Sequence, residues 1–283
     1  MIPLLKATII AVIVSLFTPL VAEIRNVTVT SGASFEPGLP AKGSIASVFC
    51  TGLEGIEGVI SAGALPLGTQ LAGVQVRIGQ ALAPLFAVAN LGGYQQINLQ
   101  VPLESQFGSA SAEVAIEQNG LRAVLAVPLR ELISPGDFFR LPNGRGLFQH
   151  AADYESVTPE NAARAGEVVI AYLTGLPGTE PAVASGQRAP SEPLAVVPQR
   201  STPTSIQIYR IQVNDSLVEP RFVGLVPGAV GLYQINFALP DTRVAGQASV
   251  RLVKTMCEVA FGTCGGPGSV HSIASTEVTI PVR

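Results

Sequence analysis

The chain has 283 residues, which is enough for about two domains of ordinary size. Only 13% of the residues are charged, the formal net charge is −3, and lysine occurs only at positions 6, 42 and 254. Because no basic run is present to neutralise phosphates, nucleic acid is excluded as a partner. Glycine (29) and proline (22) are plentiful. Together with the many valines, isoleucines and threonines, they favour strands and turns over helices.

Residues 1–22 have the pattern of a secretory signal peptide. Lys6 supplies the positive charge, residues 7–17 form an apolar run, and Ala22 offers a small residue for cleavage. The run is shorter than the roughly 20 apolar residues that a membrane-spanning helix needs. We therefore predict export with cleavage, and an uncleaved anchor is the alternative. The mature chain, residues 23–283, is expected in the periplasm or outside the cell, with no membrane span of its own.

Three cysteines are present, at Cys50, Cys257 and Cys264. In an oxidising compartment Cys257 and Cys264 can close a small hairpin loop, so we predict a disulfide between them. A metal site is the alternative, although two thiolates are only half of the ligand set that zinc prefers. Cys50 follows an apolar run at 45–49 and is expected to be a buried, unpaired thiol.

The chain contains an internal duplication. Residues 43–53 (GSIASVFCTGL) match residues 166–176 (GEVVIAYLTGL) at an offset of 123. Residues 96–102 (QINLQVP) match residues 234–240 (QINFALP) at an offset of 138. Because the order of the motifs is preserved, we predict two copies of one domain.

The offset between the copies continues to grow along the chain. Residues 127–130 (VPLR) match residues 280–283 (IPVR) at an offset of 153. The two increases place two insertions in the second copy, one around residues 177–204 and the other around residues 257–264. The predicted disulfide therefore stabilises an added hairpin.

Apolar and polar residues alternate with a period of two in both copies, for example at 96–101 and at 233–239. This alternation is typical of half-buried antiparallel strands, and turn pairs such as Asn119-Gly120 separate the runs. We predict an all-β fold with two tandem immunoglobulin-like β-sandwich domains, formed by the internal repeat and preceded by the signal peptide. The predicted organisation is a signal peptide at 1–22, a first sandwich at 23–133, a connector with a hairpin at 134–164, and a second sandwich at 165–283.

Several of these motifs resemble a known family. Residues 33–49 (ASFEPGLPAKGSIASVF), followed by Thr51-Gly-Leu53, resemble the opening of the uncharacterised C-terminal domain of many secreted acidobacterial (Solibacter-type) proteins. The resemblance continues through 96–102 and 231–236 (GLYQIN). Each half is also loosely similar to an IPT/TIG immunoglobulin-like domain. The resemblance implies export and a module appended to larger surface proteins, and it implies no activity and no catalytic residues.

Catalytic and metal-binding motifs are scarce. The two histidines, His150 and His271, do not accompany a Gly-x-Ser-x-Gly nucleophile motif. The aspartates are scattered and form no calcium loop, although Asp153, Glu155 and Glu160 leave an isolated calcium site open. We therefore predict a protein that is not an enzyme and that holds no cofactor and no metal.

The repeated Gln-Ile-Asn element supplies the candidate ligand-binding residues Gln96, Asn98, Gln234 and Asn236. Their amides could form a row that hydrogen-bonds sugar hydroxyls. Alternatively, they are the outward face of strands or satisfy backbone groups in loops. Sugar binding also calls for exposed aromatic rings, but tryptophan is absent, aromatic residues make up 6% of the chain, and most Tyr and Phe fall on the apolar phase of the predicted strands.

Taken together, these features predict an exported, non-enzymatic structural or interaction protein at the cell surface or in the extracellular space. It would present sandwich loops or sheet edges to a surface or extracellular protein. A carbohydrate-binding module with a glycan ligand is the alternative, and a secreted hydrolase is the third possibility.

Overall fold

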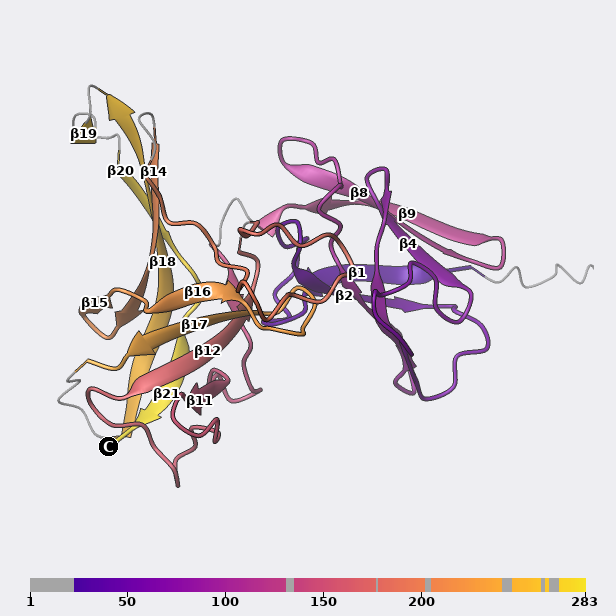
Figure 1. Cartoon of the computed structure of the whole chain (residues 1–283). Helices are drawn as coiled ribbons and strands as arrows, with labels where there is room; N and C mark the ends of the chain where they lie inside the picture. Colours follow the sequence, from indigo (N-terminus) through magenta and orange to yellow (C-terminus); the bar gives the residue numbers. More distant parts are fainter. Residues whose placement is uncertain are drawn as a thin grey trace, which may run out of the picture.

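The computed structural model describes residues 23–130, 135–176, 178–201, 205–240, 246–260, 263–264 and 270–283. These residues form antiparallel sheets, and no α-helix occurs among them. Within the described ranges, no helix has the length and apolar character needed to cross a membrane. Figure 1 shows two groups of strands, the first coloured indigo to magenta and the second rose to yellow. The predicted signal peptide lies outside the described residues.

The first domain is a sandwich of two antiparallel sheets. One sheet has the order β1-β2-β7-β6-β3 and the other β5-β4-β8-β9. This is the A-B-E-D and C′-C-F-G arrangement of immunoglobulin domains, with one short strand added beside D. The strands are β1 (Arg25–Ser31), β2 (Ile45–Thr51), β3 (Val59–Ser61), β4 (Val74–Ile78), β5 (Ala81–Leu82), β6 (Leu85–Asn90), β7 (Gln95–Gln100), β8 (Ser111–Gln118) and β9 (Leu121–Pro128).

The second domain repeats this arrangement. In one sheet, β10 and β11 both pair with β12, β12 pairs with β17, and β17 pairs with β16. In the facing sheet, β14 lies between β15 and β18, and β18 also pairs with β20 and β21. The predicted all-β, tandem immunoglobulin-like fold is confirmed. The strands are β10 (Asp137–Phe138), β11 (Phe148–His150), β12 (Val168–Thr174), β13 (Arg200–Ser201), β14 (Ser205–Val213), β15 (Ser216–Val218), β16 (Phe222–Leu225), β17 (Tyr233–Ala238), β18 (Gly246–Ala260), β19 (Thr263–Cys264), β20 (Val270–Ala274) and β21 (Val278–Val282).

The two copies share one strand register as well as one topology. Ile45 pairs with Gln100 in the first domain, and Val168 pairs with Ala238 in the second. These pairs are related by the offsets of 123 and 138 residues that the sequence motifs have. The internal duplication is therefore confirmed at the level of individual residue pairs.

Each sandwich encloses its own hydrophobic core. In the first, Val48 and Ile97 project inward from adjacent strands and are fully buried, and in the second, Ile235 and Tyr209 do the same from opposite sheets. Full burial of one such side chain stabilises the fold by about 1.5–3 kcal/mol. The apolar residues of each strand therefore face the core, and the residues that alternate with them face solvent.

The described part of the predicted connector, residues 135–164, pairs with the second sandwich. The described part holds β10 and β11, which both pair with β12, and a hairpin between them in which Arg140 bridges Gly146. Gly144 N donates to Leu141 O at 3.0 Å in the turn of this hairpin. Strands β10 and β11 together thus take the place of the first strand of the second domain, and the hairpin lies between them.

Both insertions fall where the growing offset places them. The described residues of the first include 195–197, which pair with β16, and Figure 1 shows the loop between β12 and β14 extending toward the first domain. In the second, β18 pairs with β19, with Val259 opposite Cys264. The predicted Cys257–Cys264 disulfide concerns side chains that lie outside the described part of the chain.

The two domains meet through polar contacts that are buried or partly buried. Ile45 N donates to Thr174 Oγ1 at 2.8 Å, and Thr174 Oγ1 donates to Gly231 O at 3.1 Å. Gly231 has a φ of +63°, and a Cβ there would lie 2.8 Å from the carbonyl oxygen of Gly43. The close approach of the two backbones therefore requires glycine at this position.

The first insertion completes this junction. Gln100 Nε2 donates to Gly43 O at 3.1 Å, while Gly186 N donates to Gln100 Oε1 at 2.6 Å. Ser185 Oγ accepts from Leu103 N at 2.9 Å. One buried amide on β7 thus holds the insertion of the second domain against the first.

A buried ion pair joins the end of β9 to the start of β10. Arg130 Nη2 and Nε donate to the two carboxylate oxygens of Asp137 at 2.7 and 3.1 Å, and both side chains are less than 10% exposed. A bidentate pair of this kind fixes direction as well as distance. It therefore contributes to the orientation of one domain relative to the other.

We expect Asp137→Ala to lower the free energy of unfolding by about 3 kcal/mol or more, because the change leaves a buried guanidinium without its partner. The measurement is equilibrium urea unfolding. Glu277→Ala is the matched control, since it breaks the exposed pair with Arg251 (2.9 Å) and should cost less than about 1 kcal/mol. Equal unfolding midpoints for the two variants would contradict this assignment.

Cys50 is buried and unpaired, as the sequence predicts, and burial raises the pKa of its thiol to about 11. In a variant that carries Cys257→Ser and Cys264→Ser, we expect Cys50 to react with a thiol reagent at pH 8 only after urea is added, because the thiolate is the reactive form. Mass spectrometry reports the labelling, and full labelling without urea would contradict the prediction. The parent protein, labelled in urea without a reductant, should take up one label if the predicted disulfide is present and three if it is absent.

Candidate functional site

The outer surface of the sheet β1-β2-β7-β6-β3 carries an exposed aromatic cluster beside a hydrogen-bonded polar cluster. Strands β2 and β7 supply most of it, because the inward residues of these central strands fill the core and leave the alternate residues facing outward. We call this surface the aromatic–amide face. Its members are Phe35, Phe49, Tyr94, Gln96 and Asn98, together with Ser47, which is buried and completes their hydrogen-bond network.

Three rings form the aromatic part. The ring centroid of Phe49 lies 6.3 Å from that of Phe35 and 5.7 Å from that of Tyr94, which it meets edge to face. These separations are typical of favourable aromatic pairs. Phe35 is 54% exposed and Tyr94 is 45% exposed. The flanking rings therefore present apolar surface to solvent while the half-buried Phe49 supports them.

The polar part is a closed network. Ser47 Oγ donates to Asn98 Oδ1 at 2.8 Å, and Gln96 Nε2 donates to the same oxygen at 2.7 Å. Because Asn98 Oδ1 accepts two hydrogen bonds, both amide groups are held in one orientation. Among the described residues, Asn98 Nδ2 and Gln96 Oε1 have no hydrogen-bond partner. One donor group and one acceptor are thus left free on a half-buried surface beside the rings.

Phe35 occupies a strained position. Its φ is +57°, in the left-handed region that costs an L-residue about 1–2 kcal/mol. Phe35 N donates to Ser31 O at 3.0 Å, and Arg140 of the second domain donates to Ser34 O and to Glu36 at 2.8 Å. Contacts from both domains therefore hold Phe35 in this strained conformation.

The second copy does not reproduce this face. Gln234 and Asn236 lie on β17 in the same register, but Ile170 stands opposite Asn236 where Ser47 stands opposite Asn98. Asn236 Oδ1 is buried and has no hydrogen-bond partner among the described residues. Tyr172 replaces Phe49 and donates to Gln149. Of the four candidate residues, the structure therefore places only Gln96 and Asn98 in a polar network with aromatic neighbours.

The aromatic members were not singled out from the sequence. The expectation that most Tyr and Phe lie on the inward phase does not hold for Phe49, which shares the outward phase of β2 with Ser47. The alternation in β2 could have revealed this. Phe35 and Tyr94 lie outside the strands, and the sequence alone gives no sign that their loops place them beside Phe49.

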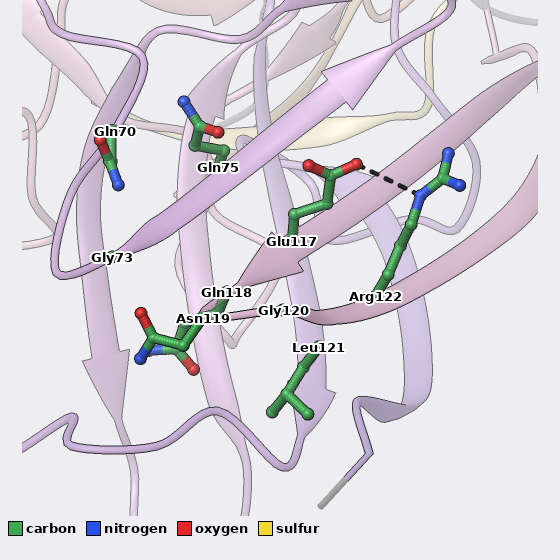
Figure 2. Close-up of a pocket in the computed structure, with 9 residues that line it drawn as sticks. All are labelled: Gln70, Gly73, Gln75, Glu117, Gln118, Asn119, Gly120, Leu121 and Arg122. Carbon is green, nitrogen blue, oxygen red and sulfur yellow. Dashed lines mark ion pairs between the residues drawn. The ribbon is translucent and has the colours of Figure 1, made fainter.

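A second candidate is a polar hollow of about 500 Å³ at the turn between β8 and β9, shown in Figure 2. The amide of Gln118 in this hollow serves the fold, because it donates to Glu54 O and Ala72 O and accepts from Glu54 N. Glu117 and Arg122 form an exposed ion pair at 3.2 Å (Figure 2). The lining residues are Gln70, Gly73, Gln75, Glu117, Gln118, Asn119, Gly120, Leu121 and Arg122.

The histidines do not form a hydrolase site in the described part of the chain. His150 is buried, its Nδ1 contacts the carboxylate of Glu167, and its Nε2 lies 3.1 Å from Asn161 O. Neither ring nitrogen is left to activate a serine. His271 is exposed on β20, opposite Met256.

The His150–Glu167 contact favours the charged form of each side chain. Burial opposes the charge on His150, but the Glu167 carboxylate and the Asn161 carbonyl, both acceptors, raise its pKa above the ordinary value. Burial also opposes the charge on Glu167, but the hydrogen bonds from His150 and from Arg164 N lower its pKa. The pair links β11 to the turn that precedes β12, which is a structural task.

The described residues contain no group of three or more His, Cys, Asp or Glu side chains that could hold a metal ion. Of the acids considered for calcium, Asp153 accepts a hydrogen bond from Glu155 N at 2.9 Å within an exposed turn. This geometry is that of a local turn cap.

No protein-family model matches the chain, and no curated protein matches its sequence. Among solved structures, the tandem Ig repeats of Dlar are 11% identical, with 86% of this chain and 91% of that chain covered and a TM-score of 0.19. The endo-fucoidan hydrolase MfFcnA4, from glycoside hydrolase family 107, is 16% identical, with 86% of this chain and 27% of that chain covered and a TM-score of 0.15. Similarities this distant carry no argument about function.

We expect the stability contribution of the His150–Glu167 pair to depend on pH. The contribution of His150 to stability is fully present below the pKa of His150 in the unfolded chain, about 6.5, and is lost as the pH rises through its higher pKa in the folded protein. The contribution of Glu167 to stability is present above the pKa of Glu167 in the unfolded chain, about 4.3, and is lost as the pH falls through its lower pKa in the folded protein. Urea unfolding of the parent and of His150→Gln should differ most between about pH 4.5 and 6.5. A difference that is constant from pH 4 to 9 would contradict the ion pair.

Proposed function

We propose that the protein is an exported interaction module in which two immunoglobulin-like domains, coupled end to end, present the aromatic–amide face of the first domain to a partner. The observation that carries this proposal is the pair of exposed rings, Phe35 and Tyr94, beside amides whose orientation is already fixed. Its role is binding, with no catalytic step.

The energetics of the face favour binding over a role in folding. Exposed rings contribute little to the core, and grouped aromatic residues on a surface are typical of interaction sites. The φ of +57° at Phe35 lowers stability while it holds the ring in solvent. A partner that covers these rings would recover the apolar surface that folding leaves exposed.

The coupling of the domains supports the same proposal. Arg140 of the second domain contacts the loop that carries Phe35, so the second domain helps to hold the binding surface. A surface that is rigid before binding loses less conformational entropy when the partner docks. The second domain would therefore act as a support for the first.

Export is part of the proposal and is favoured by the N-terminal pattern of Lys6 followed by the apolar residues 7–17. The partner would then be a component of the cell surface or the extracellular space. The sequence alone favours a protein partner. The fixed amides beside exposed rings favour a carbohydrate ligand for this face.

The test compares two substitutions that relieve the same backbone strain. Phe35 and Tyr154 are both exposed, with φ of +57° and +62°, so Phe35→Gly and Tyr154→Gly each relieve about 1–2 kcal/mol of backbone strain and should leave the protein folded. Only Phe35→Gly should abolish retention of purified protein 23–283 on cell envelopes from the producing organism. Retention that is unchanged by Phe35→Gly and by Tyr94→Ala would refute a role for this face.

A further inference from the structure

The aromatic–amide face has the chemistry of a sugar-binding platform, and we propose that its ligand is an uncharged polysaccharide chain. This inference rests on the proposed function, because it names the ligand class of the same face. It is carried by three features of the described residues, which are the rings, the free amide atoms and the absence of an unpaired charge on the face.

The rings provide stacking surface. A pyranose ring has an apolar face of C–H groups that packs against an aromatic ring, whose π face is electron-rich. The rings of Phe35 and Tyr94 both contact that of Phe49, with centroids 6.3 and 5.7 Å away, and each of the two residues is about half exposed. Two rings on one sheet surface suit a chain of several sugar units better than a single small ligand.

The amides provide directional contacts. A sugar hydroxyl both donates and accepts, so it can accept from Asn98 Nδ2 and donate to Gln96 Oε1. Ser47 Oγ and Gln96 Nε2 already bind Asn98 Oδ1 at 2.8 and 2.7 Å, and these bonds fix which atoms face the ligand. Polar groups oriented before binding give specificity at a low entropic cost.

The charges around the face indicate an uncharged ligand. All six members of the face are neutral. At its margins, Glu36 is paired with Arg140 at 2.8 Å, and Glu23 with Arg25 at 2.9 Å. A sulfated or uronic acid polymer would meet no unpaired cation on this face, and it would have to compete with these existing pairs.

The position of the face in the sheet disfavours an extended peptide. Strands β2 and β7 are central strands with neighbours on both sides, so their backbone groups are used by the sheet itself. A peptide that adds a strand needs an exposed edge. Recognition on this face is left to side chains, as it is for a sugar chain lying across a flat surface.

The second copy supplies an internal control. Gln234 and Asn236 repeat the Gln-Ile-Asn motif, but Ile170 replaces the serine, and the aromatic ring at the position of Phe49 is a tyrosine bonded to Gln149. The same motif without the network and the ring cluster should not bind. Substitutions at Asn98 and Asn236 therefore form a matched pair.

The experiment is affinity electrophoresis of protein 23–283 in native gels that contain one soluble polysaccharide each. The neutral probes are hydroxyethylcellulose, β-glucan, xyloglucan, galactomannan and dextran, and the acidic probes are alginate and polygalacturonate. The variants are Asn98→Asp, Tyr94→Ala and Asn236→Ala. Asn98→Asp keeps the oxygen that accepts from Ser47 and Gln96 but removes the free donor, so the network and the fold should survive. Thermal unfolding checks that each variant is folded.

We expect at least one neutral polysaccharide to retard the parent protein and Asn236→Ala equally, and Asn98→Asp and Tyr94→Ala to bind about tenfold more weakly or not at all. Retardation by acidic polymers alone, or retardation that the face variants leave unchanged, would overturn the inference. If no polysaccharide retards the protein while envelope retention still depends on Phe35, the glycan inference fails and the proposed interaction function stands. If envelope retention is also absent, both fail.

Discussion

The register between β2 and β7 is the constraint on which the rest of the structure depends. Because side chains alternate, this register sends Ile97 and Leu99 into the core and turns Gln96, Asn98 and Gln100 outward. Two of the outward amides form the polar part of the aromatic–amide face, and the third binds Gly43 and Gly186 at the junction. A slip of one residue would exchange the two sets, so core, face and junction are specified together.

Duplication supplied two identical registers, and a few substitutions then gave the copies different tasks. Ser47 allows the amide network in the first copy, whereas Ile170 leaves Asn236 Oδ1 buried without a partner in the described part of the second. At the end of the motif, Gln100 becomes Ala238. The first copy thus carries the polar surface, and the second carries the insertion that reaches the first.

Sequence reasoning reached the features that depend on local alternation and on the repeat, which are the strands, the two sandwiches and the outward direction of Gln96 and Asn98. It did not reach contacts between residues distant in the chain, such as Gln100 with Gly186 or Arg140 with Ser34. These depend on how loops of the two domains meet, and no periodicity encodes that. From the sequence alone the two Gln-Ile-Asn motifs look equivalent, because the residue that distinguishes their surroundings, Ser47 or Ile170, lies on the neighbouring strand.

The junction has a consequence for assembly. Domains that each carry both halves of a head-to-tail contact can add further copies by the same contact and grow into open filaments. Here the contact joins unlike ends, since Gln100 on β7 of the first domain meets Gly186 in the insertion of the second. The far end of the second domain carries Ala238 in place of that glutamine, and the first domain lacks the insertion. Both halves of the Gln100–Gly186 contact are therefore used within one chain.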